Sequence, residues 1–186
     1  MFSYFLRDYF GSPFFLSNKK DFFLLYNMIH ATTDSNAVFI VTTEEKRIDT
    51  GVPSTQIRYL FKLTNDMSEN VVYAYGQGQG VNDRYTKVQI NTGANEVYTG
   101  TVNFSPSGYW TYEIFEVSWQ DSTVTLDDDH APKTETQVLT PPASDKGVVQ
   151  GSIEKGKLNV AEASGSEEVQ YTEHSAPTGT NYIYVS

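Results

Sequence analysis

The densest group of side chains that could do chemistry is the acidic run at residues 127–129, followed by His130. Carboxylate oxygens are the ligands that hard cations prefer, and Ca²⁺ takes about six to eight oxygens. Adjacent side chains of an extended segment point to opposite sides, so this run alone rarely completes such a shell. A calcium site and a solvated acidic loop are both open readings, and we favour the loop, with no metal bound.

The histidines do not form a metal-binding pattern. His30, His130 and His174 are far apart in the sequence, whereas a zinc site needs several ligands that converge. We expect these three side chains to be exposed to solvent. Cysteine is absent, which excludes disulfides, thiolate zinc sites and cysteine nucleophiles.

Enzyme signatures are also missing. The alternating glycines of residues 76–80 lack the spacing and the following helix of a dinucleotide-binding loop, and residues 76–83 are predicted to be a flexible connection. Glu113 and Glu116 are an odd number of positions apart, so in one strand they cannot share a face as paired glycosidase carboxylates do. We therefore expect no catalytic residues, no cofactor and no enzymatic activity.

Aromatic side chains offer one further kind of chemistry, the stacking of sugar rings. In a β-sandwich such side chains more often form the core or cross-strand pairs. Their exposure decides between the two: a sugar-binding platform must be open to solvent. The candidates are Tyr73, Tyr75, Tyr109, Trp110 and Trp119.

Composition limits the class of protein. The chain has 186 residues, with 39% hydrophobic and 14% aromatic residues, which suits one domain with or without arms. Its net charge of −10 disfavours binding to nucleic acid through phosphate contacts.

Charged residues interrupt the apolar stretches of residues 1–27, so no segment there matches the roughly 20 apolar residues of a membrane-spanning helix. Lys19 and Lys20 precede an apolar stretch, but no small-x-small cleavage site follows, which argues against a signal peptide.

Short β-prone runs separated by turn residues position all of these side chains. In residues 56–64, Ile57 and its alternate neighbours share one face, and Arg58 and Lys62 share the other. No helical period is visible between residues 36 and 126, so we predict an all-β fold, an antiparallel β-sandwich of Ig-like or jelly-roll-like type, with hairpins around residues 91–95 and 106–108. The predicted strands of this region are residues 38–43, 56–64, 71–75, 84–90, 97–104 and 109–119.

The chain divides into four predicted parts: an aromatic N-terminal arm (1–35), the β-sandwich core (36–120), a linker or loop (121–147) and C-terminal strands that complete or extend the sandwich (148–186). Strands are expected at 151–161, 168–171 and 181–185. If the chain works in an assembly, residues 1–35 and 121–149 should make few contacts with the core.

The two terminal segments carry the side chains that we predict to contact partners. The N-terminal arm is rich in phenylalanine: it either packs on its own domain, docks on another subunit, or is an extension that precedes a natural start at Met28. At the other end, pairing of residues 181–185 would bury Ile183 and Val185 and leave the tyrosines outside. The predicted partner contacts are Phe14, Phe15, Phe22, Phe23, Tyr182 and Tyr184.

Residues 58–68 read RYLFKLTNDMS. This segment, with others in residues 36–119 and 151–186, resembles a poorly characterised group of small virion-associated proteins of tailed bacteriophages. The other matching segments are residues 82–87, 105–116, 156–160, 169–174 and 181–185. Members of the group commonly begin near the position of Met28. The matching segments are strands and turns, so the resemblance brings no functional residues with it.

The resemblance implies a structural protein of the virion: a decoration, minor capsid, or neck or tail component. Such a protein would be present in several copies and contact capsid, portal, neck or tail subunits, with no nucleic-acid or membrane partner. The alternative is a receptor- or carbohydrate-binding module of a phage tail or fibre, which needs an exposed aromatic platform.

Overall fold

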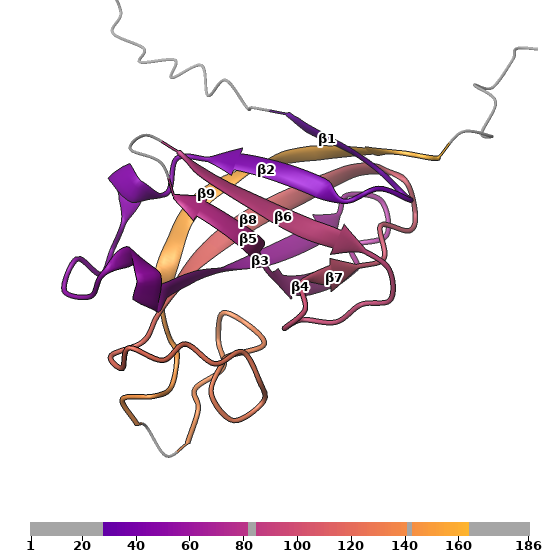
Figure 1. The fold of residues 1–186 in the computed structure, drawn as a ribbon. Helices are drawn as coiled ribbons and strands as arrows, with labels where there is room; N and C mark the ends of the chain where they lie inside the picture. Colours follow the sequence, from indigo (N-terminus) through magenta and orange to yellow (C-terminus); the bar gives the residue numbers. More distant parts are fainter. Residues whose placement is uncertain (1–27, 82–84, 141–142, 164–186) are drawn as a thin grey trace, which may run out of the picture.

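Two β-sheets packed face to face form the protein (Figure 1). The structure is a computed structural model that describes residues 28–81, 85–140 and 143–163. Within these ranges there is no α-helix, only strands, two short 3₁₀ turns and loops. The predicted all-β sandwich is confirmed.

The larger sheet has five strands, and its longest strands lie at its centre. β8 pairs antiparallel with both β3 and β9, whereas β1 runs parallel to β9 at one edge. The order across the sheet is β1 (Ile29–Thr32), β9 (Val148–Ala161), β8 (Gly108–Ser118), β3 (Ile57–Asn65) and β4 (Val71–Tyr75).

The smaller sheet contains β2 (Ala37–Val41), β6 (Thr86–Thr92) and β5 (Gln77–Val81), in that order. The two-residue β7 (Thr101–Val102) runs parallel to β6. The 3₁₀ turns η1 (Glu44–Lys46) and η2 (Ser54–Gln56) lie between β2 and β3. Most strand pairs are antiparallel, as predicted, whereas the pairs β1–β9 and β6–β7 are parallel.

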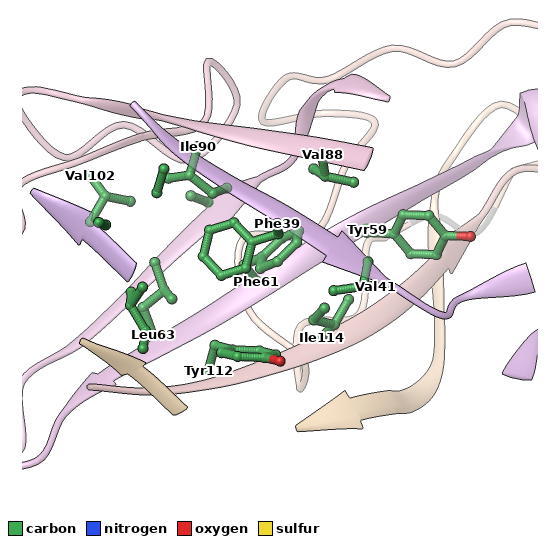
Figure 2. Close-up of a cluster of buried hydrophobic side chains, with 14 of the residues drawn as sticks. Phe39, Val41, Tyr59, Phe61, Leu63, Val88, Ile90, Val102, Tyr112 and Ile114 are labelled. Carbon is green, nitrogen blue, oxygen red and sulfur yellow. The ribbon is translucent and has the colours of Figure 1, made fainter. Parts of the chain in front are cut away.

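The core between the sheets is built from alternate residues of facing strands (Figure 2). In β3, Tyr59, Phe61 and Leu63 point inward with Ile57, as the alternating pattern predicts. Phe39 of β2 packs against Phe61 with ring centroids 4.9 Å apart, and against Tyr112 at 5.5 Å in an edge-on arrangement. These aromatic pairs join the two sheets at the middle of the sandwich.

A second hydrophobic cluster lies on the other face of the larger sheet, where the loop of residues 120–147 covers it (salmon to orange in Figure 1). Ala131 of the loop is fully buried, and Val124 and Leu126 pack against the same cluster. The buried members from the sheet are Leu60, Tyr75, Phe115 and Val117, and Trp119 joins them directly after the end of β8.

The expectation that residues 121–149 contact the core only sparsely is therefore wrong. The described residues of the loop form no strand, as predicted, but they cover apolar side chains that the sheet would otherwise expose. The same expectation fails for the described end of residues 1–35, because β1 pairs with β9 and the Thr33 N–H donates to the carbonyl of Ala161 (3.0 Å). The other residues of that segment, 1–27, lie outside the described ranges.

Two local predictions are also corrected. Most of the predicted flexible connection, residues 76–83, is the strand β5, and Gly76 just before it passes so close to Val88 and Phe61 that a Cβ would clash there. The predicted strand 97–104 is only the short β7, because a tight turn at Gly100 (φ +65°) occupies its first half.

Both predicted hairpins are absent. β7 and β8 belong to different sheets, so the segment around Pro106 crosses the sandwich instead of turning back on its neighbour. β6 and β7 run parallel, so residues 91–95 are not the turn of a hairpin. Turn residues mark where a strand ends, but they do not tell which sheet the chain enters next.

Candidate functional site

The predicted partner contacts at the two ends of the chain, Phe14, Phe15, Phe22, Phe23, Tyr182 and Tyr184, lie outside the described residues. The predicted strands 168–171 and 181–185 lie there as well. The site must therefore be sought on the sandwich itself.

The acidic run is engaged by its own loop. Asp127 Oδ1 lies 2.7 Å from His130 Nδ1, and this hydrogen bond lowers the pKa of Asp127. Asp128 forms an ion pair with Lys133 and accepts a hydrogen bond from the Tyr98 hydroxyl (2.9 Å); the lysine contact is the main cause of its lowered pKa. In the part of the chain that the structure describes, no group of three or more His, Cys, Asp or Glu is placed to hold a metal ion.

The histidines differ from one another. His30 is exposed on β1, as expected. His130 is only partly exposed, because Asp127 and Asp145 contact its ring from two sides. His174 lies outside the described residues.

The five candidate stacking aromatics do not form a platform. Tyr75, Trp110 and Trp119 are fully buried, and Tyr73 is partly buried with its hydroxyl donating to Glu135. Only Tyr109 is largely exposed, at 54%. These residues therefore supply core packing rather than a surface on which sugar rings could stack.

The buried Glu116 has a structural role. Its carboxylate accepts hydrogen bonds from the backbone N–H groups of Ile48 (3.0 Å) and Asp49 (2.8 Å), and thereby holds the loop between η1 and η2 against β8. Glu113 instead accepts a hydrogen bond from the Ser152 hydroxyl on β9 (2.9 Å). Both carboxylates thus accept hydrogen bonds that join β8 to neighbouring parts of the fold.

A polar cluster ties the turn after β3 to the neighbouring strands. Lys157 Nζ of β9 lies 2.6 Å from Asp66 Oδ2 and donates to Thr111 Oγ1 (2.8 Å), whose hydroxyl donates to Asp66 Oδ1 (2.8 Å). The hydrogen bond from Lys157 is the largest cause of a lowered pKa at Asp66. The ionised carboxylate therefore stabilises the fold.

The Asp66→Asn variant tests this contribution. Because the pKa of Asp66 is lower in the folded protein than its ordinary value of 3.8, the ionised carboxylate stabilises the fold at any pH above 3.8. This stabilisation is lost as the pH falls through the pKa of the folded state. The pair is partly exposed, so we expect the variant to lose about 1 kcal/mol or less at pH 7. Urea unfolding of both proteins across pH should show this difference vanishing in acid; a difference that stays constant would contradict the assignment.

The outer side of β2 is an exposed apolar edge. Val38 is 40% exposed and Ile40 is 58% exposed, while the alternate residues of this strand face the core. β2 ends the smaller sheet, and no described strand pairs with its other side. The strand carries no charged residue to deter another chain. We call Val38 and Ile40 the β2 edge surface.

A pocket of about 460 Å³ with a mixed polar and apolar lining opens where the chain passes from one sheet to the other. At this point β4 ends at Tyr75, and the Gly76 N–H donates to the carbonyl of Tyr59 (3.0 Å) before β5 begins in the smaller sheet. We call it the Arg58 pocket. Its lining residues are Ser54, Thr55, Arg58, Gly76, Gln77, Gly78, Gln79, Val81 and Leu126.

Sequence reasoning placed Arg58 on the outer face of β3 but did not single it out. The only signal was an arginine opposite an apolar face, a common feature of surface strands. The pocket around it depends on the change of sheet after β4, which the predicted flexible connection at 76–83 did not foresee.

No described helix is long and apolar enough to cross a membrane. No protein-family model matches the chain, and searches of curated proteins and of solved structures give no significant match. What the chain does must therefore be inferred from its own residues.

Proposed function

We propose that this chain is a non-enzymatic structural protein of a tailed-bacteriophage virion, a decoration, minor capsid, or neck or tail component. It acts in several copies through contacts with other virion proteins. The resemblance of residues 36–119 and 151–186 to small virion-associated proteins supports the class of protein. The β2 edge surface is the observation that carries the mode of action.

An exposed edge strand of this kind favours association. Unpaired backbone groups along a sheet edge can extend the sheet into a partner, and uncharged β-branched side chains do not oppose it. Covering Val38 and Ile40 would add to the association roughly 25 cal/mol for each Å² of apolar surface removed from water. Repetition of this contact around a particle would multiply a modest gain per copy.

The alternative, a carbohydrate-binding module of a tail or fibre, has less support. It requires exposed aromatic side chains that lie together, and the five candidates do not supply them. Among these five, Tyr109 alone offers a largely exposed ring, which is a weak basis for stacking.

The first test of the proposal is whether the protein is present in purified particles, measured by mass spectrometry of virions separated on a density gradient. Particles without the protein would contradict the virion assignment. Particles that contain it allow the β2 edge surface to be tested in the same system.

The Ile40→Lys variant should reduce incorporation into particles at least tenfold, because a charge on the edge strand opposes pairing and apolar contact. Ile40 is exposed, so the isolated variant should keep the melting temperature of the wild type within a few degrees. Met67→Lys is the matched control, since Met67 is 83% exposed in a turn away from β2. Equal incorporation of the two variants would rule out the β2 edge surface as a contact.

A further inference from the structure

The guanidinium of Arg58 is held in place but not neutralised. Its Nη1 donates to the backbone carbonyls of Thr55 (2.9 Å) and Ile57 (2.7 Å). These bonds use both hydrogens of Nη1 and fix the plane of the group. The N–H donors of Nε and Nη2 have no hydrogen-bond partner among the described residues, and no described carboxylate pairs with Arg58.

This free edge is the one that binds oxyanions best. The N–H groups of Nε and Nη2 lie side by side and can donate two parallel hydrogen bonds to one carboxylate. Arg58 is also partly buried, and this burial lowers its pKa, so the charge lacks part of its hydration. A bound carboxylate would replace that hydration and relieve the cost of the unpaired charge.

The rest of the pocket lining suits hydroxyl groups. Gln77 Nε2 donates to the backbone carbonyls of Tyr75 (3.2 Å) and Tyr98 (3.0 Å), which fixes its amide and leaves its oxygen available. Gln79 also lines the pocket, but its Oε1 is enclosed by protein atoms, so this oxygen is not among the groups that face a ligand. Ser54 and Thr55 add hydroxyls that can both donate and accept.

We propose that the Arg58 pocket binds an acidic monosaccharide, with its carboxylate on Nε and Nη2 of Arg58 and its hydroxyls on the Gln77 amide and on the hydroxyls of Ser54 and Thr55. The pocket volume of about 460 Å³ lies within the range of small-molecule sites. Neutral sugars lack the group that Arg58 recognises, and simple carboxylates lack the hydroxyls that Gln77, Ser54 and Thr55 recognise. The proposal does not depend on the virion assignment.

The test is a titration of the full-length chain followed by NMR chemical shifts. The probes are glucuronate, its neutral counterpart glucose, and acetate. We expect glucuronate to bind at least tenfold more tightly than either of the others, with the largest shifts at the side-chain amide of Gln77. Glucose binding as tightly as glucuronate, or no glucuronate binding at millimolar concentration, would overturn the proposal. Acetate binding as tightly as glucuronate would overturn the sugar assignment and point to the carboxylate of a protein partner.

Arg58→Gln should weaken glucuronate binding at least tenfold, and Arg58→Lys should weaken it less, because lysine keeps the charge without the two parallel donors. Lys87→Gln is the control, since Lys87 is exposed on β6 and does not line the pocket. Unchanged glucuronate affinity in Arg58→Gln would overturn the proposal. The comparison of probes on the wild-type chain remains decisive if an Arg58 variant fails to fold.

Discussion

Replacing Trp119 with alanine is expected to lower the free energy of unfolding by about 3–5 kcal/mol, the usual cost of truncating a buried tryptophan or phenylalanine. Trp119 is fully buried in the cluster between the larger sheet and the loop of residues 120–147. The loop packs closely on its ring, since a Cβ at Gly147 would lie 2.6 Å from Trp119 Cζ2. Alanine would leave a cavity, and both the larger sheet and the loop would lose their contacts with the indole ring.

Denaturant unfolding monitored by circular dichroism measures this loss. Tyr109→Ala is the matched control, because Tyr109 is also a large aromatic residue, near the other end of β8, but its side chain is 54% exposed. We expect the control to lose about 1 kcal/mol or less. Trp119→Phe should lose less than Trp119→Ala, since phenylalanine keeps a ring in the cavity, and both variants remove an indole N–H that has no hydrogen-bond partner among the described residues. A Trp119→Ala variant as stable as Tyr109→Ala would show that the loop is not part of the core.

The strands with clear alternation could be predicted from the sequence. In β3, apolar residues at every second position define the buried face, and the structure places Ile57 and Phe61 there. β8 was also predicted within one residue of its observed bounds, Gly108–Ser118. Such strands are predictable because a period of two residues leaves one face for the core.

Other elements depend on contacts that no local pattern encodes. β1 has only four residues and pairs in parallel with β9, more than 100 positions away, so its sequence alone resembles an arm. In the loop of residues 120–147, Val124, Leu126 and Ala131 have no regular spacing, yet all pack on one cluster. Their burial follows from the apolar outer face of the larger sheet, which only the assembled fold reveals.

The candidate sites show the same limit. The exposure of Val38 and Ile40 follows from alternation in β2, but their place at a sheet edge follows from the strand order. The Arg58 pocket requires that a glycine-rich segment leave one sheet for the other beside β3. The sequence shows the glycines, but not that Gly76 lies against Val88 and Phe61 of the neighbouring strands.

Gly76 is the residue at which this change of sheet is most restricted. It is buried between β4 and β5, and a Cβ there would lie 2.0 Å from Val88 Cγ1 and 3.1 Å from Phe61 Cε2. We therefore expect Gly76→Ala to destabilise the protein by about 3 kcal/mol, at the upper end of the usual cost of overpacking a core. Thermal and denaturant unfolding measure the effect.

The same glycine-rich segment supplies the control. A Cβ at Gly80 would meet no atom within 4 Å, so Gly80→Ala should change the free energy of unfolding by less than about 1 kcal/mol. The change should be a gain, because alanine leaves the unfolded chain fewer backbone conformations than glycine does. Val88→Ala removes the atom that clashes, and leaves Val88 Cβ at an ordinary 3.4 Å from the new Cβ. Gly76→Ala should therefore cost at least about 1 kcal/mol less in the Val88→Ala background than in the wild type, since residues in contact are energetically coupled. If Gly76→Ala and Gly80→Ala lowered the free energy of unfolding equally, the segment would be the flexible connection that its composition suggests. A methyl group can have different effects at the two positions only if the chain is fixed between two packed sheets.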